Sequence, residues 1–236
     1  MTITSPHNDK LKEIRKLARR RSRELAGRFV AEGEDLLAAA DAAGWPAVER
    51  YCAAGSGLPG VEVEAELLAS VSQLGSGTRA LAVYEQRWAD APAGPLCVAL
   101  HGIADPGNVG TVLRSALAFG AASVALGPDC ADPYGPKAVR ASMGALFELP
   151  LARFAGVAEL PGTTVALDAH APEPIGALDG PLTLLVGAER AGLPGDVLAA
   201  CDRVVRIPIA GESLNAAMAA TVALYEAARD RRMPTP

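Results

Sequence analysis

The chain has 236 residues and half of them are apolar, so it can build one large domain or two smaller ones around a sizeable core. It contains no run of about 18 uncharged apolar residues, and residues 1–8 are too polar for a signal peptide, so we expect a cytoplasmic protein without a membrane span. The net charge of −5 argues weakly against a nucleic-acid partner.

That average hides a strongly basic segment near the start of the chain. Nine of the 22 basic residues fall within residues 10–28, where only Glu13 and Glu24 oppose them. This excess favours contact with a polyanion such as RNA or DNA over the alternative of a solvated helix face. No aromatic residues are interleaved, so base stacking on this segment is not expected. The expected RNA contacts here are Lys16, Arg19, Arg20, Arg21, Arg23 and Arg28.

The first 90 residues predict a small α/β domain. Residues 9–26 read as one basic helix whose apolar positions are Leu11, Ile14, Leu17 and Leu25. Further elements are expected as a strand at 29–31, a helix at 32–40, strands at 48–53 and 61–63, a helix at 64–70 and a strand at 78–85. The Pro- and Gly-rich residues 91–95 form the linker candidate, so the predicted domains are 1–90 and 96–236.

From residue 96 onward, strands and helices alternate. Strands are predicted at 96–101, 123–127, 163–168, 182–187 and 204–209, with helices at 108–119, 136–145 and 214–229. Strands separated by helices predict a parallel sheet that is covered on both faces.

Several common chemistries are excluded by spacing. No Lys follows Gly107 or Gly110 as a P-loop requires, the glycines do not match the dinucleotide fingerprint, and the GxSxG elbow is missing. The four cysteines and three histidines make no ligand pattern, so neither a metal nor a disulfide framework is expected.

Three polar clusters remain at the carboxyl ends of predicted strands, where open α/β sheets bind ligands. They contain Asn108 with Arg114, then Glu189, then Ser213 with Asn215. Each has a structural alternative when read alone. Arg114 can extend into solvent, Asn108 and Ser213 can cap helices, and Glu189 can stabilise a helix start.

Taken together and in order, these clusters resemble the motifs of the SpoU (TrmH-type) branch of the SPOUT superfamily of RNA ribose 2′-O-methyltransferases. Residues 105–116 (DPGNVGTVLRSA), 185–189 (LVGAE) and 207–215 (IPIAGESLN) are similar to its three motifs, and residues 132–145 to the segment between the first two. Residues 10–37 resemble the L30e-like substrate-binding domain of that family.

The resemblance implies a SPOUT α/β fold with a deep trefoil knot, a smaller N-terminal L30e-like domain, and a homodimer with active sites at its interface. It implies S-adenosylmethionine as cofactor, held by main chain near Gly187, Ile207 and Leu214. The implied active-site residues are Asn108, Arg114, Glu189, Ser213 and Asn215, and Lys137 and Arg140 join the expected RNA contacts.

The implied reaction is methyl transfer to a ribose 2′-hydroxyl, with 23S ribosomal RNA as the expected substrate. The alternatives are a transfer RNA substrate or a non-catalytic RNA-binding protein of the same fold. Arg114 stays protonated at any working pH, so we expect it to act electrostatically, on a phosphate or on the developing alkoxide, rather than as a base.

Overall fold

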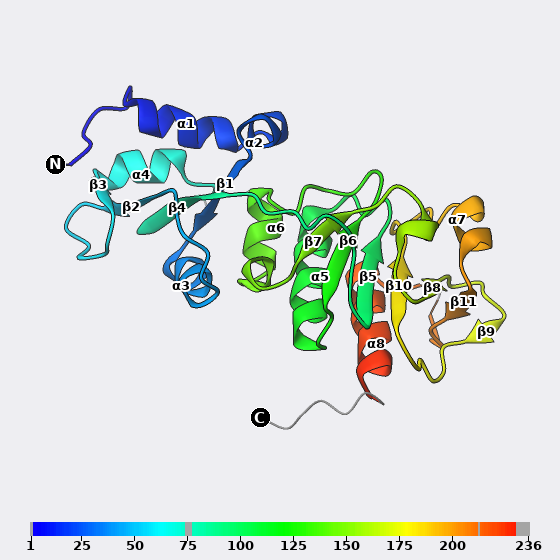
Figure 1. The fold of residues 1–236 in the computed structure, drawn as a ribbon. Coiled ribbons are helices and arrows are strands. Elements are labelled where there is room, and N and C mark those ends of the chain that lie inside the picture. The colour runs from blue at the N-terminus through cyan, green and yellow to red at the C-terminus, as the bar shows by residue number, and fades with distance from the viewer. Residues whose placement is uncertain (1, 74–76, 212, 230–236) are drawn as a thin grey trace. The chain divides into compact units, whose positions relative to one another are not determined.

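The computed structural model describes residues 2–73, 77–211 and 213–229, which form two compact units (Figure 1). Unit 1 comprises Met1–Gln86 and Asp132–Phe147, and unit 2 comprises Arg87–Ala131 and Glu148–Pro236. The sequence assigned residues 96–236 to a single domain, whereas in the structure residues 132–147 pack with the N-terminal residues.

Unit 1 has a four-stranded sheet of order β1-β4-β2-β3. Its strands are β1 (Arg28–Glu32), β2 (Glu49–Ala53), β3 (Val61–Val63) and β4 (Ala80–Glu85). Its helices are α1 (Asp9–Leu17), α2 (Arg20–Ala26), α3 (Glu34–Ala42), α4 (Ala65–Val71), α6 (Pro136–Ala141) and the 3-10 turn η1 (Ala145–Phe147). Strand β1 lies at an edge of this sheet and pairs antiparallel with β4.

Aromatic packing attaches the distant segment 132–147 to unit 1. The Phe29 ring on β1 lies 4.8 Å from the Tyr134 ring and 6.1 Å from the Phe147 ring, measured between centroids. Trp45 packs edge-on against both Phe29 and Phe147. Burial of these large rings explains why residues 132–147 pack with unit 1 and not with the parallel sheet of unit 2.

The single helix predicted for residues 9–26 is wrong, because the structure divides it into α1 and α2. Arg19 adopts an extended backbone, with φ −94° and ψ 131°, between the two helices. The Arg23 guanidinium occupies the gap and donates hydrogen bonds of 2.9 Å to two carbonyl oxygens at the end of α1, those of Leu17 and Ala18. Carbonyls that a continuous helix would satisfy are therefore satisfied by a side chain.

The break also changes which side chains are buried. Leu11, Ile14 and Leu17 of α1 are buried in the core, as the periodicity predicted. Leu25 of α2 is 80% exposed, because the second helix no longer continues the apolar face of the first.

Unit 2 is built on a seven-stranded sheet of order β7-β6-β5-β10-β8-β11-β9, in which every pairing is parallel. Its strands are β5 (Leu96–Leu100), β6 (Ser123–Leu126), β7 (Leu151–Arg153), β8 (Thr163–Leu167), β9 (Glu173–Pro174), β10 (Leu182–Val186) and β11 (Arg203–Arg206). Its helices are α5 (Pro106–Ala118), α7 (Gly195–Ala200), α8 (Ala216–Arg229) and the turn η2 (Val157–Glu159).

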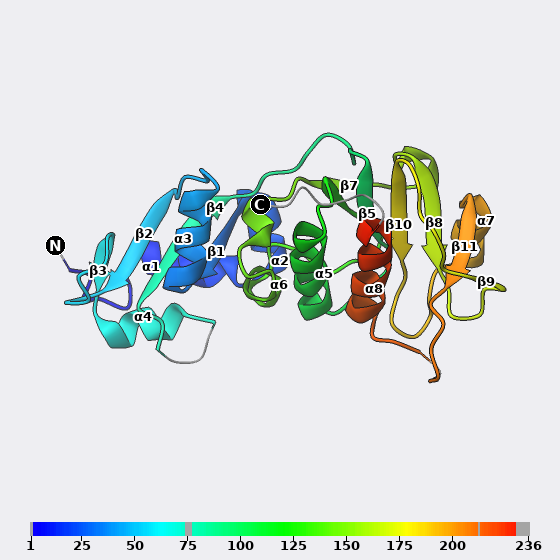
Figure 2. The same cartoon turned by 90° about the horizontal axis from the view of Figure 1, so that it is seen from below.

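Helices α5 and α8 lie side by side along this sheet, as Figures 1 and 2 show. On β10, Leu185 packs on one face with Leu193 after the strand, in a cluster to which α7 contributes. Leu184 and Val186 point to the opposite face, because side chains alternate along a strand, and α8 contacts β10. This explains the uninterrupted apolar runs of the central strands.

The predicted mixed α/β fold with a mostly parallel sheet is confirmed. The trefoil knot and the L30e-like topology stay predictions. Among the described residues, no helix has the length and apolar character needed to cross a membrane.

Candidate active site

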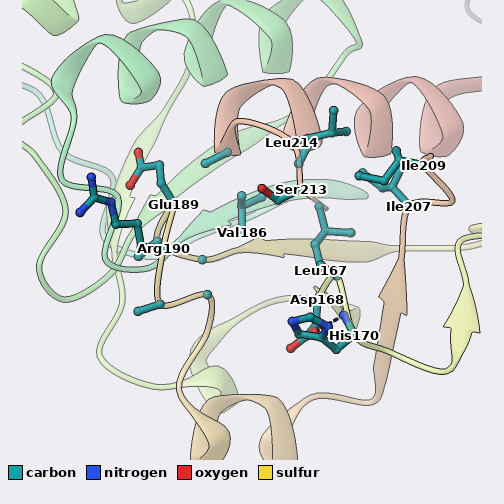
Figure 3. Close-up of a pocket in the computed structure, with 17 residues that line it drawn as sticks. Leu167, Asp168, His170, Val186, Glu189, Arg190, Ile207, Ile209, Ser213 and Leu214 are labelled. Carbon is teal, nitrogen blue, oxygen red and sulfur yellow. Dashed lines mark hydrogen bonds between the residues drawn. The ribbon is translucent and has the colours of Figure 1, made fainter. Parts of the chain in front are cut away.

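A pocket of about 480 Å³ opens in unit 2 at the carboxyl ends of β8, β10 and β11 (Figure 3). This volume is in the range of small-ligand sites. Four segments line it: the end of β8 with the residues after it, the end of β10 with the loop after it, the chain between β11 and α8, and the start of α8. The lining residues are 167–170, 186–192, Ile207, Ile209, Ser213, Leu214, Ala216 and Ala219.

The loop after β10 is pinched by close main-chain contact. Ala188 and Gly192 exchange two main-chain hydrogen bonds of 3.1 and 3.0 Å, which close the loop. A Cβ added to Gly187 would lie 2.4 Å from the Gly192 carbonyl carbon and 2.6 Å from the Leu193 nitrogen. Only glycine fits position 187, because any side chain there would push the loop apart and change the pocket wall.

Two asparagines and a glutamate form a hydrogen-bonded chain next to this pocket. Asn108 Nδ2 donates to Glu189 Oε1 at 2.6 Å, and Asn215 Nδ2 donates to Asn108 Oδ1 at 3.2 Å. The chain links α5, the loop after β10 and the start of α8. The structure therefore brings together three of the five residues predicted to be catalytic.

The start of α8 determines which atom donates and which accepts in these hydrogen bonds. Asn215 Oδ1 accepts hydrogen bonds from the main-chain N–H groups of Ala217 and Met218, at 3.0 and 3.4 Å. Its amide nitrogen must then face Asn108, whose own amide nitrogen must face Glu189. The helix cap is Asn215 and not Ser213, so the capping alternative considered for Ser213 is wrong.

The capping alternative for Asn108 is also wrong. Asp105 Oδ1 accepts hydrogen bonds from the main-chain N–H groups of Gly107 and Asn108, at 2.6 and 3.1 Å, and Pro106 occupies the first helical position. Because Asp105 caps α5, the Asn108 side chain is available to Glu189 and Asn215.

Arg114 is not part of this cluster within one chain. It lies on α5, exposed, and its guanidinium has no hydrogen bond or ion pair with the part of the chain that the structure describes. It lies six positions after Asn108, which places the two side chains about 120° apart around the helix. Arg114 also does not line the pocket, whereas Glu189 and Ser213 do.

The three predicted cofactor residues, Gly187, Ile207 and Leu214, all line the pocket. Sequence reasoning missed the segment 167–170 and Ile209, which line it as well. Asp168 Oδ1 accepts a 2.6 Å hydrogen bond from the His170 main-chain N–H, which folds this segment into a turn (Figure 3). Its position after the predicted strand 163–168 was an available signal, since ligands gather at carboxyl strand ends.

The predicted RNA contacts all lie in unit 1, but one of them, Arg23, is buried. Lys16, Arg19, Arg20 and Arg21 are exposed, Arg28 is half-buried, and Lys137 and Arg140 are exposed on α6. Arg23 is only 4% exposed, and its Nη2 pairs with Asp132 Oδ2 at 2.7 Å. Its guanidinium has its partners within unit 1, so Arg23 stabilises the fold and is not available as an RNA contact.

Comparison with protein families matches nearly the whole chain. The model described as the SpoU rRNA Methylase family matches residues 95–225, and the model described as the MRM3-like substrate binding domain matches residues 8–86.

Curated relatives agree with these matches. The chain is 32% identical to an uncharacterized tRNA/rRNA methyltransferase of Synechocystis, over 98% of this chain and 94% of that protein. It is 42% identical to the 23S rRNA (uridine(2479)-2′-O)-methyltransferase of Streptomyces viridochromogenes, over 53% of this chain and 50% of that protein. The match to this relative, and to the next one in Mycolicibacterium gilvum, thus spans about half of the relative's length.

Solved structures extend the similarity to both units. The AdoMet-bound rRNA methyltransferase of Sinorhizobium meliloti superposes with a TM-score of 0.87 at 30% identity, covering 99% of each chain. The SpoU methyltransferase AviRb of Streptomyces viridochromogenes, in complex with AdoMet, superposes with a TM-score of 0.85 at 31% identity, covering 95% of this chain and 98% of that one.

Proposed function

Because this chain belongs to the SpoU rRNA methylase family, we propose that it transfers a methyl group from S-adenosylmethionine to a ribose 2′-hydroxyl of RNA, most specifically of 23S ribosomal RNA. The observation that carries this proposal is the pocket whose wall at Gly187 admits no side chain, bordered by the directed chain Asn215–Asn108–Glu189. The two AdoMet-bound structural relatives support the cofactor.

The pocket fits S-adenosylmethionine in size and in its mixture of groups. Apolar side chains such as Ile207 and Leu214 offer contact for a flat ring, and main-chain groups of Gly187 offer hydrogen bonds. When bound there, the cofactor supplies a methyl group on a positively charged sulfur.

The protein has to align the ribose oxygen with that methyl and assist loss of its proton. Glu189 places a carboxylate on the pocket wall, and Asn108 Nδ2 donates a hydrogen bond to its Oε1 at 2.6 Å. The other oxygen can accept a hydrogen bond from the ribose hydroxyl. Arg114 would bind a substrate phosphate or stabilise negative charge on the ribose oxygen.

We further propose a homodimer in which Arg114 reaches the pocket of the other copy. Met218, Val222 and Tyr225 form a stripe on α8 and are 62%, 36% and 53% exposed. Residues spaced by three and four positions share one helix face, so this apolar stripe is continuous. A second copy packed on it would remove the stripe from water and bring its Arg114 to the Asn108–Glu189 cluster.

A complementation assay tests the shared site. Arg114→Ala and Glu189→Gln are each expected to be inactive, but heterodimers of the two contain one site with both native residues. Random exchange of subunits should restore about one quarter of wild-type activity, because about half of the dimers are mixed and each has one intact site. If both residues act within one chain, mixing restores nothing and the proposal fails.

The substrate requires a direct assay. Purified protein and labelled S-adenosylmethionine are incubated with unmodified ribosomal and transfer RNA, and ribose methylation is mapped. We expect label in 23S ribosomal RNA, which would also agree with a cytoplasmic location. Label only in transfer RNA would change the substrate, and RNA binding without any label would favour the non-catalytic alternative.

A further inference from the structure

A second pocket lies within unit 1, at the free edge of β1. It encloses about 440 Å³, a volume typical of small-ligand sites. Its walls are mainly apolar, from Ala18 between α1 and α2, Leu36 of α3, and Pro136 and Val139 around α6. Val30 and Glu32 of β1, the edge strand of the sheet, form another side of the pocket.

The β1 main chain faces this pocket with unused hydrogen-bonding groups. Gly33 N–H donates to the Ala80 carbonyl and Gln86 N–H to the Gly27 carbonyl, so odd-numbered residues of this strand bond to β4. In an antiparallel pair the direction alternates, which turns the N–H and C=O groups of Val30 and Glu32 away from β4.

These groups have no main-chain partner within the described residues, although Val30 is 8% and Glu32 9% exposed. Buried main-chain groups are nearly always hydrogen-bonded, so an edge left open inside a pocket indicates a ligand that completes it. A volume of about 440 Å³ suits a ligand of the size of one nucleotide.

The Glu32 carboxylate adds an acceptor at the same place. Its Oε1 accepts from the Gln73 N–H at 2.8 Å, and its Oε2 from the hydroxyls of Ser72 at 2.6 Å and Thr78 at 3.5 Å. These donors are neutral and leave acceptor capacity on the carboxylate, which has about four lone-pair positions. A ligand with N–H donors fits this wall better than one with acceptors alone.

Two cations stand on the α6 wall. Lys137 and Arg140 are exposed, line the pocket and lie three residues apart on one face of the helix. The Arg140 guanidinium forms no ion pair with the described residues. Their charge suits a phosphate group attached to whatever enters the pocket.

We propose that this pocket binds one unpaired base of the RNA substrate, with a preference for guanine, while Lys137 and Arg140 contact its phosphate. The inference rests on the proposed function, in that the ligand belongs to RNA. Unpaired bases are read by hydrogen bonds to their edges. Guanine presents a ring N–H next to an amino group toward Glu32, whereas uracil has no amino group.

Binding can be measured without any methylation assay. Guanosine 5′-monophosphate is titrated into the full-length ¹⁵N-labelled protein, with uridine 5′-monophosphate as the comparison. We expect the amide signals of Val30 and Glu32 to shift with the guanine nucleotide, and at least ten-fold weaker binding of the uridine nucleotide. Unchanged signals at both positions at millimolar guanine nucleotide would overturn the proposal.

A second test fills the pocket. Ala18→Phe places a ring in it from a partly exposed wall position with helical backbone (φ −61°), and Ala38→Phe adds the same ring on an exposed face of α3. We expect Ala18→Phe to weaken binding of the substrate RNA at least ten-fold. Its cofactor affinity and melting temperature should equal those of Ala38→Phe. Normal RNA affinity in folded Ala18→Phe contradicts the pocket's role.

The two tests separate this proposal from the proposed function. A protein that methylates RNA but shows neither the amide shifts nor the effect of Ala18→Phe refutes the pocket alone. A protein that binds the guanine nucleotide at Val30 and Glu32 but methylates no RNA refutes the proposed reaction instead.

Discussion

Asn108 and Glu189 lie 81 positions apart in the chain, yet their side chains are joined by a hydrogen bond of 2.6 Å. The bond exists because the parallel pairing of β5 with β10 brings both strand ends to the same edge of the sheet. It orients a carboxylate at the pocket and makes the site depend on the amide of Asn108.

Replacing Asn108 by alanine should therefore lower methyl transfer at least ten-fold, because Glu189 loses its donor and Asn215 its acceptor. Thr111→Ala is the matched control on the same helix, since within the described residues the Thr111 hydroxyl donates only to the Gly107 carbonyl. Single-turnover rates of the two variants, with melting temperatures, measure the effect. Equal rates for both variants would show that the hydrogen-bonded chain is not used in the reaction.

Replacing Arg114 by alanine should lower the methylation rate at least 100-fold, about 2.7 kcal/mol of transition-state stabilisation. Arg114 is exposed and forms no hydrogen bond or ion pair with the described residues, so the fold should be unaffected. Circular dichroism and single-turnover kinetics measure the two properties. A folded variant with near-normal turnover would remove Arg114 from the active site.

Replacing Gly187 by alanine should weaken S-adenosylmethionine binding at least ten-fold. The new Cβ would lie 2.4 Å from main chain at Gly192, so the loop must move and the pocket wall with it. Gly195→Ala is the control, because a Cβ there meets nothing within 4 Å. Isothermal titration with the cofactor compares the two. Unchanged affinity in Gly187→Ala would place the cofactor elsewhere.

The four arginines 19, 20, 21 and 23 should divide into two groups. Neutralising Arg19, Arg20 and Arg21 together should raise the RNA concentration needed for half-maximal rate without changing cofactor affinity, because phosphate contacts position the substrate. Arg23→Ala should instead lower the free energy of unfolding by about 3–5 kcal/mol, since it leaves Asp132 buried without its partner. RNA titrations and urea unfolding distinguish the groups. A stability loss in the triple variant would contradict the assignment.

Tyr84 should make unit 1 sensitive to alkaline pH. Burial raises its pKa to about 12 from the ordinary value of 10.0, and its hydroxyl has no hydrogen-bond partner in the described part of the chain. Above the ordinary value the unfolded chain loses this proton first, so the unfolded state binds fewer protons and stability falls as pH rises toward 12.

Tyr84→Phe removes both the titration and the unpaired hydroxyl. We expect it to raise the free energy of unfolding by about 1 kcal/mol at neutral pH and to reduce the loss of stability at alkaline pH. Urea unfolding at about pH 7 and about pH 11 measures both effects. An equal loss in both proteins would mean that Tyr84 does not titrate on unfolding.

Much of the fold follows from local pattern. The central strands of unit 2 are continuous apolar runs and α5 begins at a turn with Asp105 and Pro106, so their presence and order could be read directly from the residues. The same is true of the pocket-lining glycine at 187 and of Glu189, because both follow a predicted strand whose carboxyl end lies at the ligand edge of a parallel sheet.

Tertiary structure alone decided which polar side chains meet. Asp105 and Asn215 cap their helices, rather than Asn108 and Ser213. The candidates in each pair lie only two or three residues apart, and the sequence does not show which of them has the backbone geometry that a cap requires. Arg23 is buried because its guanidinium forms an ion pair with Asp132, which lies 109 positions away in the chain. The free edge of β1 and helix α6 form a pocket only because Tyr134 and Phe147 pack on Phe29, which attaches residues 132–147 to unit 1. Local propensity acts over a few residues, whereas each of these pairings is set by long-range packing.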